Sequence, residues 1–271
     1  MKRQIIKITT LVAIAIIPFT SCKKEEKSGS DSGKSRTTAK SDITTTDELL
    51  EKEGVDADKI VIEYYMDGIR SSKPTGDVSD YFPVYSATKS KEERSAVITI
   101  NMFSNEERYL IYGDVNGLKF REEKAFEAEV VAEANSRGLD VESEDAGEEL
   151  PEDFLAYVEE KHEEYFGRPE TSRLAKTTFT GWFQGWDDIV PYGSTSVFPM
   201  PSHPRLWAWN NELGCVQGWS TYSIFHLWDK GFYRKKIGVI NRWGFDYISF
   251  SSAFGLAHFN NKVTSYTHIA F

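Results

Sequence analysis

Hydrophobic and polar positions in the middle of the chain first predict strands. Residues 60–65 and 96–100 are rich in β-branched and aromatic side chains, which is typical of strands. Residues 107–113 continue that pattern after a short polar turn, so we expect 96–103 and 107–113 to form a β-hairpin. A polar turn is expected at 114–117. The segment is superficially similar to a calcium-binding EF-hand loop but lacks the spaced carboxylates of one.

Two amphipathic helices are predicted after these strands. Apolar side chains recur along one face of residues 120–137, and Gly138 follows as a stop. The second helix begins at Pro151, carries acidic residues in its first turn and ends at Gly167. His162 lies on its apolar side, where we expect it to pack.

The C-terminal segment has a different pattern. All seven tryptophans lie between Trp182 and Trp243, among short polar turns and without an amphipathic helical stretch. Short aromatic strands at regular spacing favour an all-β sandwich or barrel. We therefore expect a multidomain chain, in which a small α+β domain at 56–168 is followed by an all-β domain at 172–271.

Charge is distributed unevenly along these segments. Residues 121–166 hold seventeen acidic and four basic side chains, whereas 168–271 hold ten basic and six acidic ones. Opposite signs support two domains. The acidic stretch could not neutralise phosphates, so we expect no nucleic-acid partner.

The N-terminus indicates export. Residues 1–22 combine a positive start with an apolar run that is too short to span a membrane. The end of this run resembles the lipobox of bacterial lipoproteins, which implies that Cys22 becomes an acylated N-terminus. Residues 23–27 resemble the charged sequence that sends some Bacteroidetes lipoproteins to the outer face of the outer membrane; a periplasmic-facing or secreted protein is the alternative. Residues 23–55 contain no aromatic side chain and are expected to form a disordered tether.

With Cys22 lipidated, Cys215 has no partner within the chain for a disulfide. A buried thiol that serves packing is the expected role for it.

The C-terminal segment contains an internal repeat. Trp186 and Trp228 each precede an Asp, and each block is followed by an Asn-Asn turn, at 210–215 and 260–265. Here the chain resembles the βγ-crystallin family, whose Greek key motifs carry an aromatic-x6-Gly corner and a later Asn/Asp-Asn/Asp-x-x-Ser/Thr-Ser loop. Residues 260–265 match all six loop positions, while Lys235 stands where the second corner has Gly in the family. The resemblance implies an all-β double Greek key sandwich.

A calcium site is expected in the second loop. Its two amides, backbone carbonyls and hydroxyl concentrate neutral oxygens of the kind that calcium binds. The resemblance implies a ligand set made of Asn261, the Lys262 carbonyl, Thr264 Oγ and the Asp187 carbonyl, with Asn260 and Ser265 in support. It implies a weaker second site at Asn211, the Glu212 carbonyl and the Asp229 carbonyl, because Gly214 offers no hydroxyl there.

No enzymatic activity is expected from this sequence. No metal-ligand spacing or nucleophile motif accompanies the histidines of the C-terminal segment, which are His203, His226, His258 and His268. The leading hypothesis is a non-enzymatic, calcium-binding structural or adhesive protein held to a membrane by its lipid. One alternative is a module that recognises a glycan or protein through exposed Trp182, Trp207 and Trp219. Another is a secreted effector whose acidic domain masks the basic one.

Overall fold

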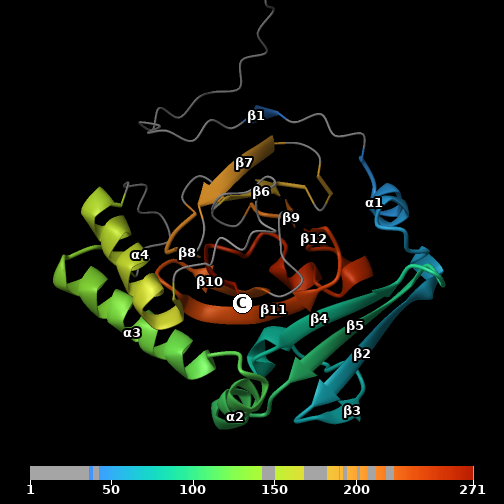
Figure 1. The fold of residues 1–271 in the computed structure, drawn as a ribbon, viewed down its shortest axis with the longest axis horizontal. Coiled ribbons are helices and arrows are strands. Elements are labelled where there is room, and N and C mark those ends of the chain that lie inside the picture. The colour runs from blue at the N-terminus through green and yellow to red at the C-terminus, as the bar shows by residue number, and fades with distance from the viewer. Residues whose placement is uncertain are drawn as a thin grey trace, which may run out of the picture. The chain divides into compact units, whose positions relative to one another are not determined.

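The computed structural model describes residues 37–38, 43–141, 150–167, 182–188, 190–191, 194–199, 202–206, 212–217 and 223–270. All of them belong to one unit, Ser32–Phe271. Two β-sheets and four α-helices in these ranges position the candidate sites (Figure 1).

The larger sheet combines strands from both halves of the chain in the order β3-β2-β5-β4-β11-β10-β13-β8. Its N-terminal members are β2 (Ile60–Met66), β3 (Ile69–Ser71), β4 (Val84–Ser90) and β5 (Ser95–Met102). Its C-terminal members are β8 (Ser202–His203), β10 (Ser223–Lys230), β11 (Arg234–Trp243) and β13 (Ser265–Ala270). The pairs β2–β5 and β4–β11 are parallel, and the other pairs are antiparallel.

The smaller sheet is antiparallel and has the order β1-β7-β6-β9-β12. Its strands are β1 (Thr37–Thr38), β6 (Trp182–Trp186), β7 (Ser194–Pro199), β9 (Cys215–Gln217) and β12 (Tyr247–Ser249). Short 3-10 helices link strands elsewhere, namely η1 (Ala57–Lys59), η2 (Val78–Tyr81), η4 (Ser252–Phe254) and η5 (Ala257–Phe259).

The predicted fold class, an α+β domain followed by a separate all-β double Greek key sandwich, is wrong. β11 pairs in parallel with β4, with Val239 opposite Val84 and Ile240 opposite Tyr85, so both halves build one mixed sheet. The described residues form a single α/β body. A ten-residue β11 at a sheet edge would expose unpaired backbone groups, and pairing with β4 satisfies them. No local pattern in the sequence predicts the pairing of β11 with β4.

The predicted hairpin at 96–103 and 107–113 is also wrong. β5 forms as expected, but its partners are β2 and β4, and the second segment belongs to helix α2 (Glu106–Asn116). Asn105 Oδ1 accepts the Arg108 N–H at 3.0 Å, which caps the start of the helix. Gly117, with a φ of 65°, ends the helix where a turn was expected.

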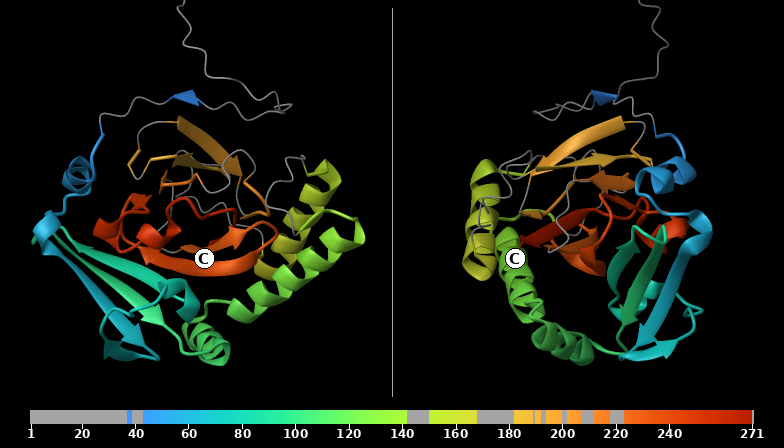
Figure 2. Two further views of the ribbon diagram at one scale, coloured as in Figure 1. Left: turned by 180° about the vertical axis from the view of Figure 1, so that it is seen from behind. Right: turned by 45° about the vertical axis from the view of Figure 1, so that its right-hand side comes forward.

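The two predicted amphipathic helices are confirmed as α3 (Phe120–Ser136) and α4 (Glu152–Phe166). They lie side by side in both views of Figure 2. His162 is 1% exposed on the packed side of α4, as expected.

Helix α1 (Thr46–Lys52) lies in the segment predicted to be a tether. Thr45 and Glu48 form a reciprocal capping box at its start, and Leu49 and Leu50 are buried. These buried leucines attach the helix to the body.

Both cores draw on both halves of the chain. The first includes Tyr85, Ile98, Phe225 and Ile240. The second joins the two long helices to the sheet through Phe126, Val130, Phe154, Trp228 and Tyr233. Cys215 is fully buried, as predicted.

The blocks of the internal repeat occupy equivalent places in the two sheets. Trp186 of β6 lies opposite Cys215 of β9, and Trp228 of β10 lies opposite Ser265 of β13. One strand of each block crosses to the other sheet, because β8 pairs with β13 and β12 pairs with β9. This exchange brings the two Asn-Asn loops into one region.

Candidate functional site

The second Asn-Asn loop is a tight turn between η5 and β13. Asn260 N–H donates to the Ala257 carbonyl at 3.2 Å, and Lys262 N–H donates to the Phe259 carbonyl at 3.0 Å. Asn261 has a φ of 56°, in the left-handed region that Asn adopts more readily than most residues. The turn therefore fixes the backbone of both amide residues.

The end of this loop is tied to β10 and to the β10–β11 turn. Thr264 N–H donates to the Trp228 carbonyl at 2.8 Å. Ser265 Oγ donates to the Lys230 carbonyl at 2.8 Å and accepts the Tyr233 N–H at 3.2 Å. The Ser265 hydroxyl thus has a structural role in closing the β10–β11 turn.

The first loop contacts the second. Gly214 N–H donates to the Trp186 carbonyl at 2.8 Å, the equivalent of the Thr264 contact in the other block. Asn261 N–H donates to the Leu213 carbonyl at 3.4 Å, which connects the two loops directly. Asp187 directly follows Trp186 and is half-buried. Asp187, the calcium ligand expected from the first block, is therefore next to Trp186, whose carbonyl contacts the first loop.

The weaker calcium site expected in the first loop offers fewer described ligands. Glu212 and Asp229 are half-buried, and Asn211 lies outside the described residues. The Asp229 carboxylate pairs with the Lys235 ammonium.

The second loop has features that fit a hard cation. Asn260 Oδ1 is buried and has no hydrogen-bond donor among the described residues. The Lys262 ammonium lies 3.4 Å from Asp77 Oδ2, so its charge is balanced outside the loop. Asn261, the Lys262 carbonyl and Thr264 Oγ would hold the ion.

Metal sites built from His, Cys, Asp and Glu side chains differ from the neutral-oxygen site of the loop. Within the ranges that the structure describes, no group of three or more His, Cys, Asp and Glu side chains could hold a metal. The loop's neutral oxygens are of another kind, so the calcium prediction stays a prediction.

A buried ionic cluster joins α3 to the larger sheet, and it was not anticipated from the sequence. The Lys236 ammonium of β11 pairs with Glu123 Oε1 and lies 3.4 Å from Glu127 Oε1. It also donates to Tyr109 Oη at 3.3 Å. His226 Nδ1 lies 3.6 Å from Glu123 Oε2, and the side chains of both are at most 1% exposed.

The cluster sets the charge states of its members. Burial would raise the pKa of Glu123, but the Lys236 ammonium and, to a smaller extent, His226 lower it to about 2. Burial followed by the Glu123 charge raises the pKa of Glu127, so that carboxyl retains its proton more readily. Burial lowers the pKa of His226 to about 3. One ammonium is thus balanced by one carboxylate.

A sequence signal for this cluster existed in α3. Glu123 shares the buried stripe of that helix with Phe120, Phe126 and Val130. A carboxylate among apolar positions at helical spacing indicates a buried partner. The partner could not be identified, because Lys236 lies 113 residues away.

His258 packs beside the second loop. Its Nε2 lies 3.0 Å from Tyr85 Oη, and the two rings stack at 5.3 Å between centroids. Burial lowers the pKa of His258 to about 4. The other histidines considered in the C-terminal segment are buried, namely His203, His226 and His268.

Exposed tryptophans would support a recognition module. Trp186, Trp228 and Trp243 are buried in the cores. The side chains of Trp182, Trp207 and Trp219 lie outside the described part of the chain, as does Cys22.

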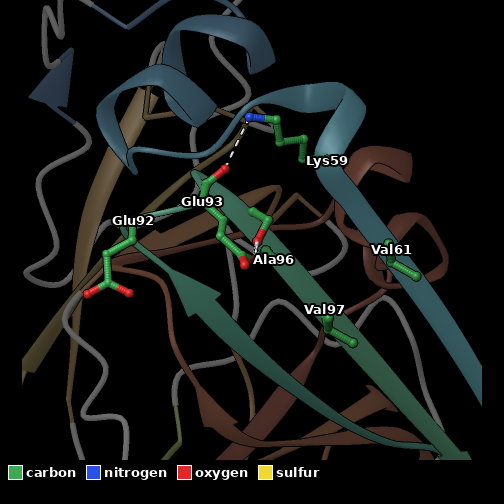
Figure 3. Close-up of a pocket in the computed structure, with 7 residues that line it drawn as sticks. Lys59, Val61, Glu92, Glu93, Ala96 and Val97 are labelled. Atoms are coloured by element: carbon green, nitrogen blue, oxygen red, sulfur yellow. Dashed lines mark hydrogen bonds between the residues drawn. The ribbon is translucent and has the colours of Figure 1, made fainter.

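Two shallow depressions lie on the N-terminal half. The first, on the outer side of β2 and β5, is lined by Lys59, Val61, Glu93 and Val97 (Figure 3). The Lys59 ammonium there donates to the Glu93 carbonyl at 3.1 Å. The second lies beside α2 and is lined in part by Phe103, Ile111 and Val115.

Comparison with known proteins gives no relative. No protein-family model, curated protein or solved structure matches this chain. Among the helices in the described ranges, none has the length and apolar character to cross a membrane.

Proposed function

We propose that this protein is a non-enzymatic lipoprotein whose second Asn-Asn loop binds calcium in a structural or adhesive role at the cell envelope. The observation that carries the proposal is the loop itself, where Asn260 Oδ1 is buried without a donor among the described residues. Asn261 has a left-handed backbone conformation, and the Thr264 N–H donates a hydrogen bond to the Trp228 carbonyl. Oxygens held in this way offer a hard cation a preorganised site.

Calcium in this loop would stabilise the whole body. His258 contacts Tyr85 of β4, and the Lys262 side chain reaches Asp77 beside η2. Asn261 also contacts Leu213 in the first loop. The ion would therefore bind where both repeat blocks and the N-terminal half meet.

Thermal unfolding of the full chain in millimolar calcium and in chelator tests the proposal. A ligand that binds only the folded state at 100 times its Kd adds about 2.7 kcal/mol to the free energy of unfolding. For a protein of this size that raises Tm by roughly 5–10 °C. An unchanged Tm, with no heat on titration, would contradict calcium binding.

Matched variants then locate the site. Asn261→Ala and Thr264→Val should each remove most of the calcium-dependent rise in Tm, because each removes a side-chain oxygen. Thr264→Ser keeps the hydroxyl and should keep the rise. Asn211→Ala, at the equivalent position in the first loop, serves as the control and should have little effect. Equal losses in both loops would refute the assignment.

The membrane anchor is tested separately. Cys22→Ser should move the protein from the membrane fraction to the soluble fraction of cells, because the lipid on Cys22 is the proposed attachment. The variant should retain its calcium response. Continued membrane association would show that another element holds the protein there.

A further inference from the structure

Helix α4 is held to the body around a buried histidine. The His162 ring packs against Phe166 at 4.6 Å and edge-to-face against Phe126 of α3 at 5.6 Å between centroids. Neither ring nitrogen makes a hydrogen bond within the described residues, and the residue is 1% exposed. A protonated imidazole in this aromatic surrounding would be a buried charge without a carboxylate counter-ion among the described residues.

Within the described part of the chain, no carboxylate lies within hydrogen-bonding distance of the His162 ring to compensate such a charge. Burial opposes protonation of His162 most, and the charges of His268 of β13, His226 of β10 and Lys119 before α3 add to this effect. The backbone of His268 offsets them slightly. Burial is the largest cause, and it lowers the pKa of His162 to about 3.

The polar contacts of α4 with α3 respond differently to acid. Lys161 lies 2.7 Å from Glu129 Oε1, Tyr165 donates to Glu129 Oε2 at 2.9 Å, and Arg137 lies 2.7 Å from Asp153. Hydrogen bonds from Lys161 and then Tyr165 lower the pKa of Glu129, so this half-buried carboxylate stays charged in mild acid. His162 is therefore the group in this contact that first opposes packing as pH falls.

We propose that mild acid releases α4 from the body and that His162 is the residue that senses the proton. The unfolded or released helix offers an imidazole with an ordinary pKa of about 6.5, while the packed ring resists protonation down to about 3. The stabilising contribution of the neutral ring is complete above pH 6.5 and is lost as pH falls toward 3. Release would uncover Phe126, Phe232 and Tyr233, which α4 helps to bury.

His226 differs from His162 in its surroundings. Burial lowers the pKa of its ring to about 3; the charge of Glu123, whose Oε2 lies 3.6 Å from Nδ1, favours protonation of the ring and the Lys236 ammonium opposes it. Glu127 also belongs to this cluster. Acid therefore opposes burial of the His226 ring as it does that of His162, but His226 lies in β10, which pairs along its length with β11 and β13.

Hydrogen exchange of the full chain tests the proposal. The protein is equilibrated at pH 6.5 or 4.5 and then labelled briefly at one common pH. Because the open form alone takes the proton, each pH unit below 6.5 raises the opening equilibrium about tenfold. We expect amides of α4 to open about 100-fold more at pH 4.5, while those of β10, β11 and β13 stay protected. Simultaneous loss of protection in α4 and in these strands would overturn the proposal.

Variants separate a pH sensor from a packing residue. His162→Phe fills a similar volume among aromatic rings without titrating, so α4 should stay protected at pH 4.5. His258→Phe removes a titrating ring at a distant contact and should leave the opening of α4 at its wild-type pH. Release of α4 at the same pH in His162→Phe as in the wild type would refute the sensor role. If that variant does not fold, the exchange pattern of the wild type still decides whether α4 opens alone.

Discussion

At the scale of single residues, strain gathers at the β10–β11 turn. Phe232, Tyr233 and Lys235 have φ values of 58°, 57° and 53°, in the left-handed region that costs L-residues free energy. Packing compensates for the two aromatic residues, which are buried against the helices. Lys235 is exposed and stands where the aromatic-x6-Gly corner of the βγ-crystallin pattern has Gly. Its backbone conformation is the one that Gly adopts without steric cost.

Lys235→Gly should therefore be more stable than Lys235→Ala by about 1 kcal/mol, because only the glycine relieves the left-handed strain. Both variants lose the exposed ion pair with Asp229, so the comparison isolates the backbone. Urea unfolding of the full chain measures the difference. Equal stability of the two variants would show that this backbone conformation is not strained.

At the scale of elements, the Glu123–Lys236 pair fixes α3 on β11. Both side chains are largely buried, at 1% and 16% exposure. Two charges removed from water require each other, since either one left alone carries its full desolvation cost. This pair specifies which face of α3 packs and where along the strand.

Lys236→Met should lower the free energy of unfolding by about 3–5 kcal/mol, because the Glu123 carboxylate then stays buried without its cation. Adding Glu123→Gln should restore more than about 1 kcal/mol. Denaturant unfolding of both single variants and the double variant measures this coupling. Additive losses would mean that the two side chains do not interact.

At the scale of the whole molecule, the C-terminal half depends on the N-terminal half. β11 pairs with β4, and α3 and α4 cover Trp228, Phe232 and Tyr233. Its apparent independence in the sequence came from composition and charge, which describe local segments only.

A fragment containing residues 172–271 alone should therefore fail to fold cooperatively. It would expose one edge of β11 and the apolar side chains that the helices and N-terminal strands bury. Circular dichroism melts of this fragment beside the full chain provide the measurement. A cooperative transition for the fragment at the full-chain Tm would contradict this dependence.

Much of the candidate loop could be predicted, and part of the fold could not. The Asn-Asn pattern and its spacing from each Trp identified two loops, and the structure brings them together through Asn261 and Leu213. The segment at 107–113 was misassigned because its aromatic and β-branched residues outweighed the cap at Asn105. A helix cap is a single hydrogen bond, and it was weaker evidence than a run of strand-forming residues.

The sequence by itself determined the elements whose cause is local. The periodicity of α3 and α4 requires them to bury one face, and the strand-forming residues of β2 and β5 favour extended backbone. The tertiary structure alone decided the parallel pairing of β4 with β11 and the contact between Glu123 and Lys236. Backbone hydrogen bonding between strands is the same for many sequences, and a buried charge specifies only that some partner exists. Which partners meet depends on burying both cores at once.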